Sequence, residues 1–389
     1  MNARSHSRPR SLEQEPGSLQ EEIWSQFRAV LKQELKAMVE QALEEELTEH
    51  LAARSHERTA ERRGYRNGHY QRRLLTRHGE IPDLAVPRAE EGGVEFQTLG
   101  RYQRRQLEID KILGQLFLAG ISTRRLRQLS EALYGQRVSA TTISKTTAHL
   151  AEELEQYRTA PIADEEVEFL FLDGITERVR ELGVERKILL CALGMTAAEK
   201  KRILGFRLVD AEDAASWKAL LMELKGRGLT GKHLRLITVD GCPGLLAALK
   251  EIYPFQKVQR CIAHRLRNVV VKLKRHQRGP VMAECKAIFA APSKPEAIRR
   301  FRAWSERWRV EAERAVHCLE KDFYHLLHYY AFPPELWKKI RTTNVLERTF
   351  REYRRRTRPM QVFPNPDSAE RIYYGVTDYL NRNWEERPQ

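Results

Sequence analysis

The sequence predicts an α/β fold, in which a mixed sheet with helices against it precedes an all-helical block. Three adjoining apolar runs, a helix, a strand, a helix and a strand follow one another between residues 165 and 260, an order typical of such a sheet. Residues 262–340 lack strand patterns, and Trp304, Trp308 and Phe323 lie there at helical spacing. The region before residue 160 indicates mostly helices.

The N-terminal segment is predicted to be a disordered lead-in followed by one amphipathic helix. Residues 1–18 are rich in Ser, Pro, Arg and Gly, and apolar side chains then recur at helical spacing from Ile23 to Leu47. Two roles are open for this helix, which are packing on its own domain and self-association.

Arginines dominate residues 54–77, with Tyr65 and Tyr70 among them. Gly64 and Asn67-Gly68 are turn signals, and short apolar alternations as far as Phe96 indicate small strands. Arginine suits phosphate contacts, so we expect DNA binding here, with a solvated charged face as the alternative. The DNA-contacting residues predicted in this stretch are Arg62, Arg63, Arg66, Arg72 and Arg73.

Residues 107–155 indicate helices separated by short breaks. Ser139 is expected to cap a helix whose first turns carry Thr141, Thr142 and Lys145. A helix, a turn and a second helix with small polar residues facing outward are typical of a major-groove reader. An ordinary three-helix bundle is the alternative.

Two of the predicted strands end in a carboxylate. These are residues 167–173, ending at Asp173, and residues 234–240, ending at Asp240. Ligands of open α/β sheets gather beyond the carboxyl ends of strands, and two neighbouring acids repel unless a cation lies between them. Two-metal phosphoryl transfer needs this arrangement.

A third carboxylate, Glu347, lies in a predicted helix with Asn344 near its N-cap. Pairing with Arg351 at i, i+4 is the simpler explanation for Glu347. A metal-binding carboxylate beside arginines would fit a site that grips DNA phosphates. The arginines expected to contact DNA from this helix are Arg348, Arg351, Arg354 and Arg355.

Composition favours a polyanionic partner. Lys and Arg number 68 against 53 Asp and Glu, which gives a net charge of +15, and nucleic acid is the usual partner of such a chain. No run approaches the roughly 18 apolar residues of a membrane helix, and the first ten residues do not resemble a secretory signal. Five cysteines are few and odd in number, so we expect a reduced, cytoplasmic protein without a disulfide framework.

Cys261 and His264 are spaced for two ligands of a metal on one helix. A structural zinc site needs four ligands, and Cys285 and His276 are candidates to complete it. Core packing of Cys261 is the alternative.

Together these segments resemble the Mutator-like transposases of bacterial insertion sequences. The resemblance covers about residues 60–385. It rests on Phe-Leu-Asp-Gly-Ile around Asp173, Val-Asp-Gly-Cys around Asp240, the Cys-x-x-His segment of residues 259–268, and Thr-Asn-Val-Leu-Glu-Arg around Glu347.

The resemblance implies an RNase H-like core with an Asp-Asp-Glu triad of Asp173, Asp240 and Glu347. These residues would hold two Mg²⁺ ions, which Mn²⁺ could replace, with Cys261, His264 and Asn344 in supporting roles. The expected function is binding of terminal inverted repeats on double-stranded DNA, followed by strand cleavage and strand transfer. We expect a homodimer or larger assembly, no membrane association, and a location at the nucleoid. A catalytically silent DNA-binding regulator and an RNase H-fold nuclease are the alternatives.

The expected domain boundaries follow from these assignments. They are 1–53 for the lead-in and helix, 54–160 for the DNA-binding region, 161–260 for the first part of the catalytic core, 261–340 for a helical insertion, and 341–389 for the last part of the core.

Overall fold

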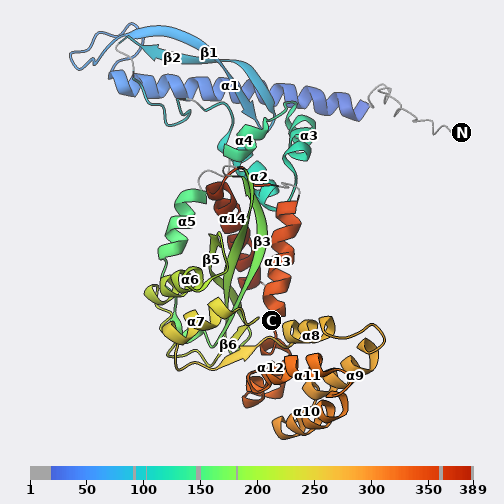
Figure 1. Ribbon diagram of the computed structural model, residues 1–389. Helices are drawn as coiled ribbons and strands as arrows, with labels where there is room; N and C mark the ends of the chain where they lie inside the picture. The colour runs from blue at the N-terminus through green and yellow to red at the C-terminus, as the bar shows by residue number, and fades with distance from the viewer. Residues whose placement is uncertain are drawn as a thin grey trace, which may run out of the picture. The chain divides into compact units, whose positions relative to one another are not determined.

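The computed structural model describes residues 19–90, 93–101, 103–145, 150–180, 183–358 and 362–386. The lead-in expected over residues 1–18 lies outside these ranges. The chain divides into two compact units (Figure 1). Unit 1 comprises Met1–Phe117 and Thr123–Thr146, and unit 2 comprises Leu118–Ser122 and Thr147–Gln389. None of the described helices is long and apolar enough to cross a bilayer.

Unit 1 combines a long helix, a β-hairpin and shorter helices. Helix α1 (Leu19–Leu51) contacts strand β2 (Gly79–Ala89), which pairs antiparallel with β1 (Arg66–Thr76). Leu43 packs in one apolar cluster with Leu74, Leu84 and Val86. The first half of α1 leaves its apolar side chains exposed instead. Three helices follow the hairpin: α2 (Leu107–Leu118), α3 (Thr123–Tyr134) and α4 (Ala140–Lys145).

The region is mostly helical as predicted, but its strands are longer than the small ones expected and include the second half of the arginine-rich stretch. This half is a strand, because its apolar residues pair with those of β2 on one face. Asn67-Gly68, read as a turn signal, lies inside β1 at an irregularity of the ladder, where Gly68 has φ +63°. The turn falls at residues 77–78, between the paired Thr76 and Gly79. Val94 and Phe96 lie outside the strands.

Unit 2 is built on a five-stranded mixed sheet of order β5-β4-β3-β6-β7. Strands β4 and β5 pair antiparallel, β3 pairs antiparallel with β4, and β6 and β7 run parallel to β3. The strand bounds are β3 (Phe169–Arg180), β4 (Val184–Met195), β5 (Lys201–Val209), β6 (Leu236–Val239) and β7 (Val258–Arg260). The predicted mixed α/β fold is therefore confirmed.

Helices cover both faces of this sheet (Figure 1). On one face, α6 (Ala214–Gly226) and α7 (Pro243–Ile252) pack Trp217 and Leu249 against alternate sheet residues such as Leu172. On the other face, α13 (Asn344–Thr357) and α14 (Pro366–Glu385) contact β3. Since side chains alternate along a strand, Asp173 shares the second face with Phe169 and Phe171.

A helical block separates β7 from α13. It comprises α8 (Ile262–Val271), α9 (Arg278–Phe289), α10 (Lys294–Trp308), α11 (Glu313–Glu320), α12 (Pro334–Ile340) and two short 3₁₀ turns. Buried hydrogen bonds join it to the sheet. Gln259 donates to the carbonyl of Leu326 at 3.0 Å, and Thr238 donates to that of Ile340 at 2.7 Å.

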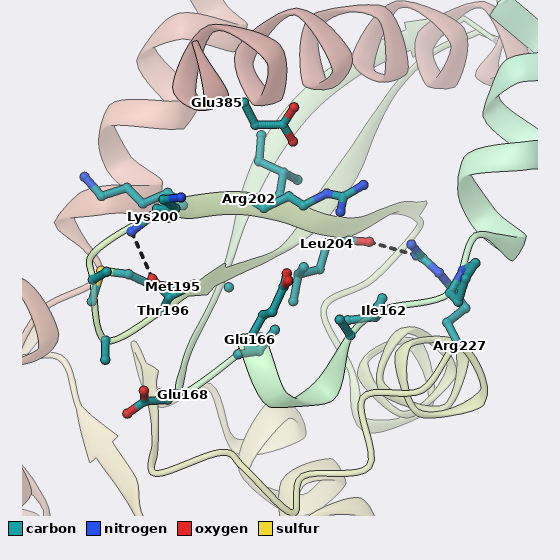
Figure 2. Close-up of a pocket in the computed structure, with 18 residues that line it drawn as sticks. Ile162, Glu166, Glu168, Met195, Thr196, Lys200, Arg202, Leu204, Arg227 and Glu385 are labelled. Atoms are coloured by element: carbon teal, nitrogen blue, oxygen red, sulfur yellow. Dashed lines mark hydrogen bonds between the residues drawn. The ribbon is translucent and has the colours of Figure 1, made fainter. Parts of the chain in front are cut away.

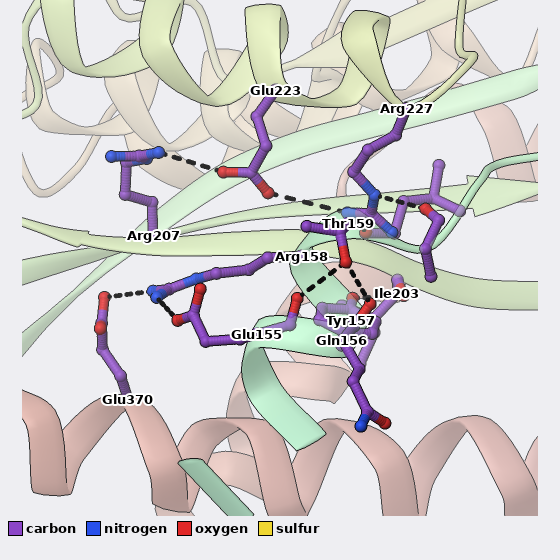
Figure 3. A network of polar contacts seen from close by, with 12 residues as sticks. Glu155, Gln156, Tyr157, Arg158, Thr159, Ile203, Arg207, Glu223, Arg227 and Glu370 are labelled. Atoms are coloured by element: carbon purple, nitrogen blue, oxygen red, sulfur yellow. Dashed lines mark hydrogen bonds and ion pairs between the residues drawn. The ribbon is translucent and has the colours of Figure 1, made fainter. Parts of the chain in front are cut away.

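The outer edge of the sheet is covered by α5 (Leu150–Thr159) and α14. Tyr157 donates its hydroxyl to the carbonyl of Ile203 at 2.8 Å, and Asn381 of α14 bonds both the N–H and the carbonyl of Ile203. Figure 3 shows the charged groups around this contact, in which Arg158 pairs with Glu370. Edge strand β5 is therefore closed to pairing with another strand at Ile203.

Candidate active site

The two aspartates lie at the end of the parallel ladder between β3 and β6. Leu172 and Val239 are its last paired residues, and Asp173 and Asp240 follow them directly. The expectation that Asp173 ends its strand is wrong. Strand β3 continues to Arg180 because residues 173–180 pair with β4 as an antiparallel hairpin.

Backbone N–H groups hold one oxygen of each aspartate. Gly174 donates to Asp173 Oδ1 at 2.9 Å, and Cys242 donates to Asp240 Oδ1 at 2.9 Å. The turn after Asp240 requires glycine, because Gly241 has φ +99° and the Arg260 guanidinium occupies the space that a Cβ would fill. Both carboxylates are thus oriented by the chain that follows them.

Burial and neighbouring charge both act on these carboxylates. Asp173 is only 6% exposed, and burial raises its pKa to about 6, with a further increase from Asp240 that His264 opposes. Burial also raises the pKa of Glu212 to about 7, helped by Asp240 and Asp173. Mutual repulsion of this kind is what a bound cation relieves.

Glu212 is a site residue that the sequence reasoning missed. It lies in the connection between β5 and α6, accepts a hydrogen bond from Trp217 Nε1 at 3.2 Å, and lies against Gly174. Strand β5 runs parallel to β3, so the connection after β5 begins at the end of the sheet beyond Asp173. The rule that ligands gather beyond carboxyl ends of strands could have identified it.

Glu347 approaches from α13, in its first turn. Its ion pair is with Arg267 of α8 rather than with Arg351, and His264 Nε2 lies 3.8 Å from Glu347 Oε1. Asn344 is the first residue of the helix and Thr343 occupies the N-cap position. Two cationic side chains from α8 therefore hold the third predicted carboxylate.

Cys261, His264 and Thr343 form a hydrogen-bonded network near Asp173 and Glu347. Thr343 donates its N–H to Cys261 Sγ at 3.3 Å, and its hydroxyl lies 3.3 Å from His264 Nδ1. The bond with Cys261 raises the pKa of His264 to about 8, although burial acts against it. Burial raises the pKa of the Cys261 thiol, but bonds from His264 and Thr343 outweigh it and lower that pKa overall. Thr343 also lowers the pKa of Asp173, against the larger effect of burial.

The chemistry of the donor set suits a hard divalent cation, since the converging groups are carboxylates. As the side chains stand, however, no group of three or more His, Cys, Asp or Glu residues within the described ranges is placed to hold a metal ion. This applies to the Asp-Asp-Glu set and to zinc binding by Cys261 and His264. Cys285 is buried in α9.

The predicted arginines of α13 lie on several surfaces of unit 2. Arg348 and Arg355 line a cavity with Lys201 and Glu352, and Arg355 pairs with Glu352 at 3.0 Å. Arg354 lines another cavity with residues of β3 and β4. Arg351 is exposed. The structure does not gather these four side chains into one cluster.

The predicted DNA-contacting residues of unit 1 fall into three groups: some bond within the unit, some line one groove, and the others are exposed. Arg62 and Arg66 bond within the unit, Arg62 to the carbonyl of Gly64 at 2.9 Å and Arg66 to Glu44 and Thr48 of α1. Arg63 is exposed. Arg72, Arg73 and Thr142 line one groove, while Thr141 and Lys145 lie exposed on α4. Ser139 caps α4 as predicted, accepting from Thr142 N at 3.0 Å.

A separate cavity of about 540 Å³ lies at the other end of the strands from the aspartates, where β4 ends and β5 begins (Figure 2). Glu166, Lys200 and Arg202 line it, and Arg227 donates to the carbonyl of Leu204 at 2.8 Å in its wall. Because Phe169 at the start of β3 pairs with Met195, this cavity lies at the end of the sheet away from Asp240. It is not part of the candidate active site.

Comparison with known proteins identifies the family of the chain. The model of the family described as "Transposase, Mutator family" matches residues 11–387. The chain is 33% identical over 320 residues to the transposase for insertion sequence element ISRM5 of Rhizobium meliloti (strain 1021), which covers 82% of this chain and 79% of the relative. It is 34% identical over 324 residues to the transposase for IS406 of Burkholderia multivorans (strain ATCC 17616 / 249), covering 82% and 81%. The chain therefore belongs to the Mutator family of transposases.

Proposed function

We propose that this protein cleaves and joins DNA at the terminal inverted repeats of an insertion sequence, through Asp173, Asp240 and Glu347. The observation that carries the proposal is the position of the two aspartates as the first residues beyond the β3–β6 ladder. A sheet of three antiparallel strands continued by two parallel ones supports an RNase H-like core. The α8–α12 block would then be the helical insertion, and residues 54–160 the DNA-binding region.

Each acidic residue has a defined part in this proposal. Asp173 and Asp240 present the oxygens left over from their backbone hydrogen bonds, and Glu347 completes the set after leaving Arg267. Two Mg²⁺ or Mn²⁺ ions held there would activate the attacking oxygen and stabilise the leaving oxygen of a phosphodiester. Arg267 and His264 hold Glu347 until then, and Thr343 bonds Cys261 and His264.

The decisive test is metal-dependent cleavage of duplex DNA that carries the element's end. Asp173→Asn and Glu347→Gln should each abolish cleavage while DNA affinity stays within about twofold, because the arginines are untouched. Asp210→Asn is the matched control, since that carboxylate is 84% exposed and pairs with Lys187. Cleavage at the normal rate by either site variant contradicts the triad.

The same assay separates the alternatives. A catalytically silent regulator would bind the end DNA without cleaving it in any form, including the wild type. A nuclease of the same fold would cleave without joining strands and without preference for the repeat. Joined products that require the repeat sequence support transposition.

We also propose that the protein acts at the nucleoid as a dimer or larger assembly, because two DNA ends have to be joined. The first half of α1 supplies a candidate contact: Ile23, Trp24, Phe27 and Val30 are each more than half exposed and recur at helical spacing. Trp24→Ser with Phe27→Ser should shift the sedimentation coefficient towards that of the monomer. Tyr324→Ser, also an exposed aromatic side chain, should leave it unchanged. A double variant that sediments like the wild type contradicts this contact.

A further inference from the structure

A groove of about 860 Å³ within unit 1 is lined by arginines from three segments. We call it the arginine groove. The segments are residues 70–73 of β1, residues 101 and 104–105 after β2, and residues 136–139 and 142 at the turn between α3 and α4. The arginines that line it are Arg72, Arg73, Arg101, Arg104, Arg105 and Arg137, and Glu80 is the acid among them. Positive charge from separate parts of the sequence is thereby concentrated on one concave surface.

Backbone hydrogen bonds fix two of these segments to each other. Leu75 of β1 donates to the carbonyl of Arg104 at 2.9 Å and accepts from the N–H of Gln106 at 2.9 Å. Arg72 also donates to the carbonyl of Gly100 at 3.0 Å. This part of the wall is thus a short extension of the hairpin, and the backbone that carries these arginines is fixed before any ligand binds.

The arginines of the groove differ in whether they already have an ion-pair partner. Arg105 pairs with Asp110 at 2.7 Å and Arg137 pairs with Glu131 at 2.6 Å. Arg73 and Arg104 are exposed and make no ion pair with any residue in the described ranges. Two arginines that line the same groove and have no ion-pair partner among the described residues indicate a site for an anionic ligand.

The other groups in the groove argue against base reading. Tyr70 is its aromatic side chain, and the Arg88 guanidinium covers one face of that ring at 4.6 Å. The ring also packs against the apolar cluster of unit 1, so it is poorly placed to stack on an unpaired base. Ser139 and Thr142 are hydrogen-bonded to each other in the cap of α4. What remains is suited to phosphate contacts, which position DNA without reading its sequence.

We propose that the arginine groove binds the sugar–phosphate backbone of duplex DNA, with Arg73 and Arg104 as its principal phosphate contacts and with no preference for sequence. This rests on the proposed function, since it assigns a site to the DNA that the transposase acts on. Under this proposal, unit 1 binds the DNA backbone at one site and recognises the sequence at another. Discrimination between sequences then depends on groups outside this groove.

The test is binding of the full-length protein to two 30-bp duplexes of unrelated sequence in EDTA, measured by fluorescence anisotropy between 50 and 200 mM salt. Removing both side chains with Arg73→Ala and Arg104→Ala should lower the slope of log K against log salt by about 2, at roughly 0.9 per phosphate contact. Affinity should fall by the same factor for both duplexes. Arg73→Lys with Arg104→Lys should keep the wild-type slope.

Arg302→Ala with Arg314→Ala is the matched control. These arginines are also exposed, on α10 and α11, and make no ion pair with a described residue. An unchanged slope in the Arg73/Arg104 alanine variant overturns the proposal, as does a loss confined to one duplex or an equal loss in the control. Unchanged thermal unfolding of the variant excludes misfolding as the cause.

Failure of the proposed function would give a different pattern. If Asp173→Asn retains wild-type cleavage but the arginine variant loses duplex affinity, the triad is wrong and the groove stands. If Asp173→Asn abolishes cleavage but the arginine variant binds like the wild type, the triad stands and the groove is wrong.

Discussion

At the scale of single residues, Asp173 is a buried carboxylate whose charge is costly to the metal-free protein. Its pKa of about 6 in the folded chain exceeds its ordinary value of 3.8, mainly because it is buried. The folded protein therefore retains this proton at a pH where the unfolded chain has released it. This bound proton contributes to the free energy of unfolding. The contribution is present at pH 4 and is lost as the pH rises through about 6.

Asp173→Asn should remove this loss, because asparagine keeps an oxygen that accepts from Gly174 but carries no charge. In EDTA at pH 8 we expect the variant to be more stable than the wild type by on the order of 3 kcal/mol. At pH 4 the difference should be small. Urea unfolding at both pH values measures it, and equal midpoints at pH 8 would contradict the assignment of buried charge to Asp173.

At the scale of elements, one side chain of α14 makes two of the hydrogen bonds that close edge strand β5 at Ile203. Asn381 is 8% exposed and accepts from Ile203 N at 2.8 Å while donating to Ile203 O at 3.1 Å. Asn381→Ala leaves a buried N–H without its acceptor. We expect a loss of about 2–3 kcal/mol in the free energy of unfolding.

Asn383→Ala is the control for this element. Asn383 lies two residues further along α14 and donates to the carbonyl of Tyr379 in its own helix, so its loss should cost less than about 0.5 kcal/mol. Denaturant unfolding compares the two variants. Equal destabilisation would mean that the contact with Ile203 contributes nothing.

At the scale of the whole molecule, the two units have separate apolar cores. The core of unit 1 lies between α1 and the hairpin, and that of unit 2 between its sheet and helices α6 and α7. We expect two transitions in calorimetry. Mg²⁺ at about 100 times its Kd should raise only the transition of unit 2, by about 5–10 °C. A single transition, or an equal shift of both, would contradict this view.

The sequence predicted the apolar strands and the helices of unit 2 well, because their burial imposes clear periodicities. The arginine-rich strand β1 escaped prediction, since its buried residues are confined to the three at its end and do not alternate with exposed ones. The extension of β3 past Asp173 escaped as well, because polar Thr176 and Arg178 alternate there with Ile175 and Val179 on a partly exposed hairpin. Glu212 belongs to no motif. Its place beside Asp173 depends on the path of the connection between β5 and α6, which the sequence pattern does not indicate.

The continuation of β3 beyond Asp173 has a mechanical consequence. A carboxylate in the middle of a strand, bonded to β4 along its length, cannot shift without distorting the ladder. Glu347 has no such restraint: it extends from a helix and is held by the side chains of Arg267 and His264. Under the proposed mechanism, the glutamate is therefore the group that moves, and replacing Arg267 should change the rate of cleavage more than the position of the cut.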